Sequence, residues 1–319
     1  MGTSTNSTAS ISVVVPAHNE ERFLDEALAS LARQSHGNIE IIVVDNGSTD
    51  RTPEIVQAWT QRDARFRAWR LERASLHESL RQGFALARSD LIARLDADDI
   101  AEPNRLERQY GYLLANPQLG VLGSAATLID AKGKTIGQTT PCLGDEAIRQ
   151  RLPQECPFVH SSVMMRRGAY ERVGGYRARL NLAEDYDLWL RMSPTTRMAN
   201  LPDPLIRYRV HKDSITARKL PEVVLTSLCV WAAHVAREAG VPEPFANGMP
   251  VLRRALPLLG FSRTEVLRRI YRGQFERWLM TLPLPAIYRP KLRRIAGSAG
   301  LGAVLHTGLA LTAAKSRTA

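Results

Sequence analysis

Residues 91–99 read Leu-Ile-Ala-Arg-Leu-Asp-Ala-Asp-Asp, a short apolar run that ends in three carboxylates. The apolar part predicts a buried strand. Asp96 and Asp98 then point to the same side of an extended backbone, so both can reach one ligand. Negative charges packed at a strand end are costly unless cations meet them, and a divalent metal carrying phosphates is the natural partner. A helix cap is the alternative, because a helical pattern follows Pro103, but capping needs only one such residue.

Outward from this stretch, strands and helices alternate. Strands are predicted at 11–16, 39–44 and 66–71, and helices at 20–34, 52–62 and 75–88. The alternation predicts an α/β fold with a Rossmann-like, mostly parallel sheet flanked by helices. Ligands of such sheets bind outside the carboxyl ends of the strands. Polar clusters stand at three of those ends, at 16–20, 45–50 and 96–99, which predicts a nucleotide or phosphate site.

The common glycine-rich phosphate loops are missing. The turn after the first strand reads Pro16-Ala17-His18-Asn19-Glu20, without the glycines of a dinucleotide-binding turn, and no P-loop pattern occurs anywhere in the chain. The phosphates must therefore be met by metal through acidic residues. This favours an enzyme that binds a nucleotide diphosphate through Mg²⁺ or Mn²⁺.

The segment from 118 to 215 is less regular, with shorter apolar runs and more turns. Asp185 lies at the predicted N-terminus of an amphipathic helix whose Leu188, Trp189 and Met192 face inward. A carboxylate that faces a metal-pyrophosphate site can act as general base for a hydroxyl nucleophile. Early-helix acids also complement the helix dipole, which is the structural alternative.

Charge is distributed unevenly over the 319 residues. The net charge is +11, and residues 251–319 hold 13 Lys and Arg against Glu265 and Glu276, so the whole excess lies there. Arginines alternate with apolar residues across 251–294, which suits an amphipathic helix on an anionic membrane; a bundle packed on the catalytic domain is the alternative. No nucleic acid partner is expected. We predict a disordered stretch at 1–10, a catalytic domain at 11–220 and a basic helical region at 221–319.

Two further features bear on the cellular compartment. The three cysteines, Cys142, Cys156 and Cys229, fit neither a metal spacing nor a disulfide framework, which suggests a reducing compartment. The polar first ten residues do not look like a signal peptide. We therefore expect a cytoplasmic protein, with peripheral attachment to the inner face of the plasma membrane through 251–294 as a further expectation.

Taken in order, these motifs resemble the family 2 glycosyltransferases, which have the GT-A fold. The resemblance rests on residues 12–20, 41–50 and 93–100, and on Glu184-Asp185 followed by Leu188 and Arg191. Residues 160–164 and 174–176 are similar to family segments near the donor sugar and acceptor. The resemblance covers about residues 11–215.

The resemblance implies a role for each matching residue. Nucleotide-sugar contacts would come from Pro16, Ala17, His18, Glu20, Asp45, Asn46, Asp96 and Gly175. Asp98, Asp99 and His211 would hold Mn²⁺ or Mg²⁺, although a single loop histidine is more often structural. Asp185 would deprotonate the acceptor hydroxyl, which displaces the nucleotide diphosphate with inversion at the anomeric carbon.

Two departures leave choices open. Asn46 stands where the family often has a second acid, so the donor can be a UDP, dTDP or GDP sugar. Arg81 replaces a common asparagine and either assists a phosphate or lies on a helix surface. The expected acceptor is a glycan or a lipid-linked molecule, in bacterial surface polysaccharide synthesis. The alternatives are a nucleotidyltransferase, which would normally show a glycine-rich basic turn, and a non-catalytic membrane-associated scaffold of the same fold.

Overall fold

A computed structural model describes residues 10–250 of the chain except 154, 179, 181 and 247–248. The basic segment 251–294 and residues 1–9, on which two sequence predictions fall, lie outside the described residues. The strands are β1 (Ile11–Ala17), β2 (Ile39–Asn46), β3 (Phe66–Leu71), β4 (Leu91–Arg94), β5 (Ile100–Ala101), β6 (Leu119–Ile129), β7 (Thr135–Gln138), β8 (Met164–Arg166), β9 (Arg197–Arg209), β10 (Phe245–Ala246) and β11 (Met249–Pro250). The helices are α1 (Leu24–Ala32), α2 (Thr52–Arg62), α3 (Leu76–Leu86), α4 (Arg105–Ala115), α5 (Asp145–Arg151), the 3₁₀ turn η1 (His160–Ser162), α6 (Arg167–Arg172), α7 (Glu184–Met192), α8 (Ile215–Arg218) and α9 (Leu220–Glu238).

One large sheet carries the fold, in the order β3-β2-β1-β4-β8-β6-β9-β5, with β7 paired to β6. The first four strands in this order are parallel, as the alternation of strands and helices predicts. Strand β8 lies antiparallel between β4 and β6, and β6 and β9 are again parallel. The predicted α/β class and mostly parallel sheet are confirmed.

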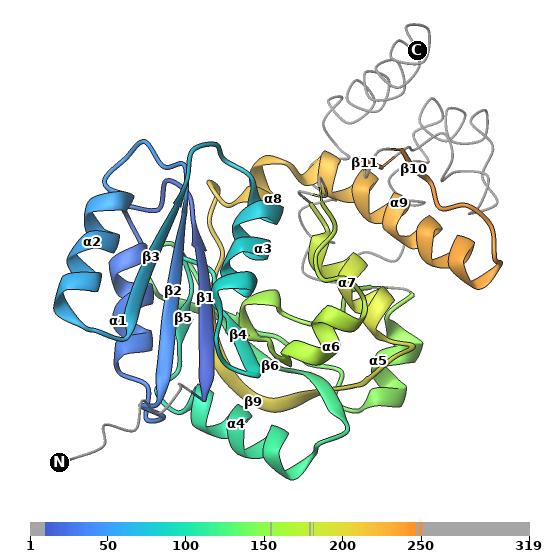
Figure 1. The fold of residues 1–319 in the computed structure, drawn as a ribbon, viewed down its shortest axis with the longest axis horizontal. Coiled ribbons are helices and arrows are strands. Elements are labelled where there is room, and N and C mark those ends of the chain that lie inside the picture. Colours follow the sequence, from blue (N-terminus) through green and yellow to red (C-terminus); the bar gives the residue numbers. More distant parts are fainter. Residues whose placement is uncertain (1–9, 154, 179, 181, 247–248, 251–319) are drawn as a thin grey trace, which may run out of the picture. The chain divides into compact units, whose positions relative to one another are not determined.

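Helices cover both faces of the parallel half of the sheet (Figure 1). Apolar residues of α1 and α2 share one core with Val13 and Val15 of β1, whose side chains point to a single face. Helix α3 packs on the opposite face, where a Cβ on its Gly83 would come within 2.3 Å of Val14 Cγ1. Strands β1, β2 and β4 are buried along their whole length, which explains why their sequences read as nearly continuous apolar runs. Strand β3, at the edge, is partly or fully exposed after Phe66.

Local patterns located most of these elements. Helix α2 and strand β3 have the bounds that the sequence predicts. Helix α1 begins at Leu24 rather than Glu20, because residues 20–23 form a turn in which the Glu20 carbonyl accepts the N–H groups of Phe23 and Leu24. That turn belongs to the site described below.

The second half contains longer strands than the sequence predicts. Strand β9 has 13 residues despite Pro202 and Pro204, and prolines inside a run argue against a strand. The register shows how they fit, since Ser124 of β6 faces Leu201 and the next residue faces Pro204, so two residues of β9 bulge out of the ladder. A long strand pair therefore forms where local patterning predicts irregular chain.

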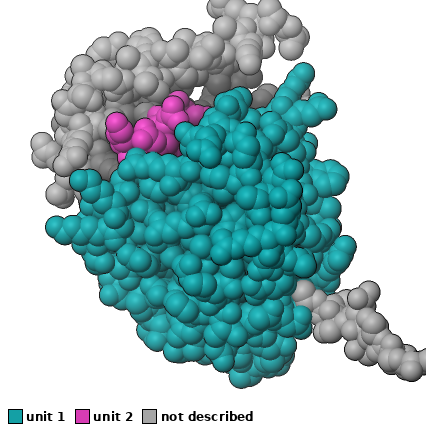
Figure 2. Space-filling view, turned by 90° about the vertical axis from the view of Figure 1, so that its left-hand side faces the viewer, with its two compact units in different colours: residues 1–148, 158–176, 192–211 teal, residues 149–157, 177–191, 212–319 magenta. Residues whose placement is uncertain are grey.

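The chain divides into two compact units (Figure 2). Unit 1 comprises residues 1–148, 158–176 and 192–211 and contains the large sheet. Unit 2 comprises residues 149–157, 177–191 and 212–319, so it takes in most of α7 together with α9. Within the described residues, no helix combines the length and apolar character needed to cross a membrane.

Candidate functional site

Three carboxylates gather in the loop after β4, which we call the acidic loop (residues 96–99). One carboxylate oxygen each from Asp96, Asp98 and Asp99 lies within 4.8 Å of the others. Asp96 is paired with the buried Arg94, and its backbone N–H donates to Ser161 Oγ at 2.9 Å. The convergence predicted from the sequence is therefore present.

Asp99 is fully buried and differs from its neighbours. Its Oδ1 accepts the backbone N–H of Arg209 at 2.7 Å, whereas its Oδ2 makes no regular hydrogen bond with any described residue. Burial raises the pKa of Asp99 well above its ordinary value, and the charges of Asp98 and Asp96 raise it further. The Arg209 N–H and the nearby Ser161 hydroxyl act in the opposite direction. Added positive charge at this place would stabilise the ionised loop.

Two buried arginines lie beneath the acidic loop. Arg94 has a side chain only 4% exposed, and Arg105 is fully buried. Burial lowers the pKa of Arg105 to about 9, and the Arg94 charge contributes in the same direction while Asp99 opposes it. Arg105 donates to the Arg94 carbonyl at 2.7 Å, which fixes the end of β4 where the loop begins.

His211 comes to the same loop from the end of β9. Its Nε2 lies 2.9 Å from Asp98 Oδ2, across 113 residues of sequence. The side chain of His211 is only 4% exposed. Oxygen ligands together with an imidazole suit Mn²⁺, and carboxylate oxygens alone suit Mg²⁺. The unbonded Asp99 oxygen and the clustered negative charge fit a divalent cation, so Asp98, Asp99 and His211 remain the predicted ligands.

The turns after β1 and β2 are tied to each other, and we call residues 17–21 and 45–52 the turn pair. His18 Nδ1 donates to the Asn46 carbonyl at 2.8 Å, and Asn19 Oδ1 accepts the Thr49 N–H at 2.8 Å. The Glu20 N–H donates to Thr52 Oγ1, also at 2.8 Å. Asn19 adopts a left-handed φ of 55°, which asparagine tolerates better than most residues. The polar groups named at this strand end are thus largely occupied with each other.

The two polar residues at the end of β2 are nearly buried. Asp45 Oδ1 accepts the Ser48 N–H at 3.0 Å, and its Oδ2 lies 3.2 Å from Arg70 Nη1 in an ion pair. Asn46 Oδ1 accepts the Ser75 N–H at 2.6 Å. Because a backbone N–H can only donate, the amide oxygen must be the atom that faces it. The Asn46 side-chain oxygen therefore already has a donor from the chain.

The remaining predicted nucleotide residues occupy defined places. Pro16 and Ala17 pair with Val44 and Asp45 at the carboxyl ends of β1 and β2. Gly175 has a φ of +65°, and a Cβ there would lie 2.5 Å from the Tyr170 ring, so packing alone requires glycine. Its contact with a donor sugar stays a prediction. Arg81 lies on the exposed face of α3, and whether it assists a phosphate stays a prediction.

His160 is a further titratable group in unit 1. Burial, together with the Arg94 charge, lowers its pKa well below the ordinary value, so the imidazole is neutral at physiological pH. Its Nε2 lies 2.8 Å from the Tyr176 hydroxyl. The sequence places this histidine in a family-like segment but gives no sign of its protonation state.

Asp185 belongs to unit 2, near the start of α7. Its Oδ1 accepts the Tyr186 N–H at 2.7 Å, and the Cys156 thiol lies 3.8 Å from its Oδ2. Leu188, Trp189 and Met192 are fully buried, as the helical pattern predicts. The role of Asp185 as general base stays a prediction.

Solved structures of similar fold are glycosyltransferases. The chain matches Staphylococcus aureus TarS 1–349 in complex with UDP-GlcNAc with a TM-score of 0.60 and 17% identity, over 94% of this chain and 92% of that one. It matches the mannosyltransferase PcManGT from Pyrobaculum calidifontis, in complex with GDP-Man and Mn²⁺, with a TM-score of 0.55 and 20% identity, over 95% and 80%. These likenesses confirm the GT-A fold.

Sequence comparisons agree with the fold. The chain is 31% identical to the O-antigen biosynthesis glycosyltransferase WbnJ of Escherichia coli, over 64% of this chain and 81% of the relative. It is 31% identical to the amylovoran biosynthesis glycosyltransferase AmsE of Erwinia amylovora, over 65% and 79%. The model of the glycosyl transferase family 2 matches residues 12–174, which include the turn pair and the acidic loop. The chain is therefore a glycosyltransferase and belongs to glycosyl transferase family 2.

Proposed function

We propose that the protein transfers a sugar from a nucleotide-diphosphate sugar to a hydroxyl of a glycan or lipid-linked acceptor, with a divalent metal and with inversion. The observation that carries this proposal is the acidic loop, where Asp99 keeps a buried oxygen without a regular hydrogen bond beside two further carboxylates. Such a cluster is costly unless a cation meets it.

The comparisons support the chemistry in outline. The two similar structures hold UDP-GlcNAc and GDP-Man, and one of them holds Mn²⁺. Two relatives take part in O-antigen and amylovoran biosynthesis, which supports surface polysaccharide synthesis here. The basic segment 251–294 is proposed to hold the enzyme on an anionic membrane beside its acceptor.

The residues predicted to bind the cation and the acceptor have the following roles in the proposed reaction. Asp98, Asp99 and His211 hold the cation, and Asp96 contacts the ribose. A bound Mn²⁺ or Mg²⁺ supplies positive charge for the leaving diphosphate. Asp185 takes the proton from the acceptor hydroxyl as its oxygen bonds to the anomeric carbon. The bond from that carbon to the diphosphate breaks on the opposite side, so the configuration inverts.

The turn pair is proposed to hold the nucleotide base. His18, Asp45 and Asn46 lie at adjacent strand ends, where ligands of parallel sheets bind. The Asn46 side-chain oxygen has a donor in the Ser75 N–H. UDP, dTDP and GDP sugars all remain candidate donors.

The test is a panel of UDP-, dTDP- and GDP-sugars with and without Mn²⁺, using the wild type and Asp98→Asn. Asp90→Asn is the matched control, because this exposed aspartate precedes the same strand at its other end. We expect one donor to turn over with Mn²⁺ and release nucleoside diphosphate, and we expect Asp98→Asn to lose about 100-fold or more. Release of sugar 1-phosphate in place of nucleoside diphosphate would indicate nucleotidyl transfer. If no nucleotide sugar binds with metal present, the scaffold alternative replaces the enzyme.

A further inference from the structure

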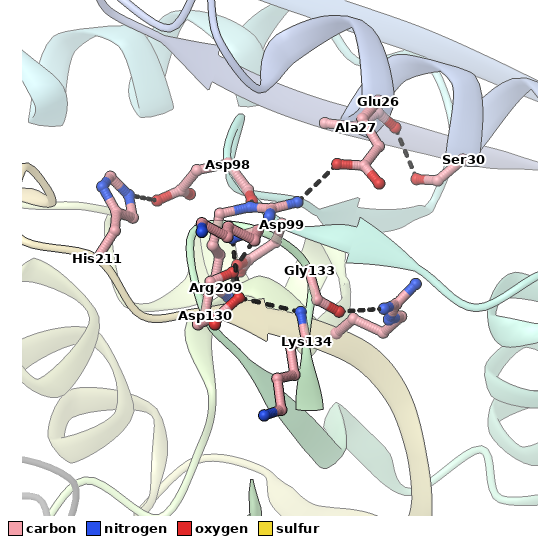
Figure 3. A network of polar contacts seen from close by, with 12 residues as sticks. Glu26, Ala27, Ser30, Asp98, Asp99, Asp130, Gly133, Lys134, Arg209 and His211 are labelled. Carbon is pink, nitrogen blue, oxygen red and sulfur yellow. Dashed lines mark hydrogen bonds and ion pairs between the residues drawn. The ribbon is translucent and has the colours of Figure 1, made fainter. Parts of the chain in front are cut away.

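We propose that Arg209 is a positioning residue that holds the acidic loop in the geometry required to bind a divalent cation. The inference rests on the proposed metal site. Arg209 is not itself a predicted metal ligand, so its role is additional to those of Asp98, Asp99 and His211. Arg209 is the last residue of β9, and its side chain is only 2% exposed. Figure 3 shows it beside Asp98 and Asp99, with Glu26 and Asp130 around it.

The arginine reaches three separate segments through its side chain. Its Nε donates to the Asp98 carbonyl at 2.8 Å, which fixes the backbone of the loop between the two predicted ligands. Its Nη2 donates to Glu26 Oε2 on α1 at 2.7 Å, and its Nη1 donates to the Asp130 carbonyl after β6 at 3.3 Å. The guanidinium thus joins the loop to a helix and to a strand end.

The backbone of Arg209 contributes a fourth contact. Its N–H donates to Asp99 Oδ1 at 2.7 Å, so one oxygen of Asp99 is held while Oδ2 stays without a regular hydrogen bond. Side chain and backbone therefore act on consecutive residues of the loop. The spacing between the Asp98 and Asp99 carboxylates depends on where β9 ends.

Phe23 extends this arrangement to His211. The Phe23 ring lies 4.5 Å from the Arg209 guanidinium carbon and 5.1 Å, between ring centroids, from the His211 imidazole. The phenylalanine ring immediately precedes α1, which follows the first turn of the turn pair. Arg209 and the imidazole beside Asp98 thus share one apolar support.

Only arginine can make these contacts together. A planar guanidinium presents donors in several fixed directions, whereas a lysine ammonium is a single point charge on a flexible stem. Lysine at 209 keeps the positive charge near Asp98 and Asp99 but cannot reach the loop carbonyl, Glu26 and the Asp130 carbonyl at once. Arg209→Lys therefore separates geometry from charge.

Arg207 provides a matched control on the same strand. It lies two residues earlier, and its Nη2 donates to the Gly133 carbonyl at 2.8 Å without a described side-chain contact to the acidic loop. Arg207 is partly buried, whereas Arg209 is buried. If arginine contacts on β9 mattered only for stability, neither Arg207→Met nor Arg209→Lys would change metal affinity. The proposal predicts that they differ in metal affinity.

The experiment measures Mn²⁺ affinity without donor, by calorimetry or by the electron paramagnetic resonance signal of free Mn²⁺. We expect Arg209→Lys to weaken binding about 10-fold or more, the range seen when residues that orient metal ligands are changed. Glu26→Ala removes one anchor at a half-exposed helix position, where alanine suits the helix, and we expect about a 3-fold weakening. Arg207→Met should bind Mn²⁺ as the wild type does, whatever its melting temperature.

Wild-type Mn²⁺ affinity in both Arg209→Lys and Glu26→Ala would overturn the role of Arg209 and leave the metal site standing. Glu26→Ala keeps the test decisive if Arg209→Lys does not fold. A wild type that binds no Mn²⁺, or an Asp98→Asn variant with wild-type affinity, would overturn the proposed metal site and the role of Arg209 with it. The two failures are therefore distinguishable.

Discussion

The turn pair and the acidic loop lie at the same end of the parallel strands, yet they differ in how far their polar groups are hydrogen-bonded within the chain. In the turn pair, side chains and backbone groups of one turn bond those of the other, as between Asn19 and Thr49. In the acidic loop, three carboxylates crowd together and the buried Asp99 retains an oxygen without a regular hydrogen bond. The bonds of the first region are complete within the chain, and we propose that a cation completes the second.

Because of this difference, we expect substitutions in the turn pair to affect mainly stability and substitutions in the acidic loop to affect mainly catalysis. Changes in the turn pair remove bonds that the folded state already makes, so they lower the free energy of unfolding. Changes in the acidic loop remove like charges that repel one another in the metal-free protein, so they affect catalysis more than folding.

The largest expected effect is that of Asp99→Asn. We expect metal-dependent turnover to fall about 100-fold or more, because a charged oxygen near the leaving diphosphate is lost. The free energy of unfolding without metal should fall by less than about 1 kcal/mol or rise, because the Arg209 N–H keeps an acceptor. Steady-state kinetics at saturating Mn²⁺ and urea denaturation in EDTA measure the two quantities. A larger loss of unfolding free energy in Asp99→Asn than in Asp50→Ala, the variant of the turn pair, would contradict the contrast between the two regions.

Asp50→Ala tests the turn pair. Asp50 accepts the Glu21 N–H and the Thr52 N–H, both at 3.0 Å, and the second lies at the start of α2. We expect the free energy of unfolding to fall by about 2 kcal/mol, as for the loss of a helix-capping residue, with Mn²⁺ affinity unchanged. Glu54→Ala, an exposed acid in the first turn of α2, is the control. A selective loss of metal binding in Asp50→Ala would contradict the distinction.

The smallest effect is a pH dependence at the opposite strand ends. Burial alone would raise the pKa of Glu40, but donors from Ser12, the Arg88 N–H and Arg67 outweigh it and lower that pKa below its ordinary 4.5. The stabilisation is therefore present above pH 4.5 and is lost as the pH falls through the lowered folded-state pKa. Glu40→Gln should be less stable by about 1 kcal/mol at pH 7, and the difference should shrink below pH 4.5.

Chemical denaturation from pH 3 to 7 measures this difference. A gap between the wild type and Glu40→Gln that grows as the pH falls would contradict the assignment. The partners of the Glu40 carboxylate lie within the chain, as do those of the polar groups in the turn pair. Removal of this carboxylate should therefore leave Mn²⁺ affinity unchanged.

Local sequence patterns predict the parallel half of the fold well. Residues 52–62 have helical character and residues 66–71 a weaker strand character, and their neighbours in sequence are their neighbours in space. The meeting of the three strand-end clusters follows from the parallel sheet, because β2, β1 and β4 are adjacent. Asp96, Asp98 and Asp99 could accordingly be named in advance.

The remainder depends on pairings between distant residues. Pro202 and Pro204 argue against a strand at β9, so local patterns do not predict it. Nothing in the local sequence shows that the hydrogen-bonded ladder between β6 and β9 skips two residues. The hydrogen bond from Ser75 to Asn46 and that from Arg209 to Asp98 join residues 29 and 111 positions apart, and neither leaves a local pattern. The nucleotide roles in the turn pair and the role of Asp185 remain predictions.

Strand β9 also has a consequence for the order in which the protein is made. Synthesis proceeds from the N-terminus, so Asp98 leaves the ribosome 113 residues before His211, and β9 is the last strand of the large sheet to appear. A nascent chain without residues 197–211 carries the acidic carboxylates without Arg209 or His211. Cations that bind only the native state stabilise it by mass action. If the acidic loop binds a cation as proposed, metal capture is coupled to the closing step of folding.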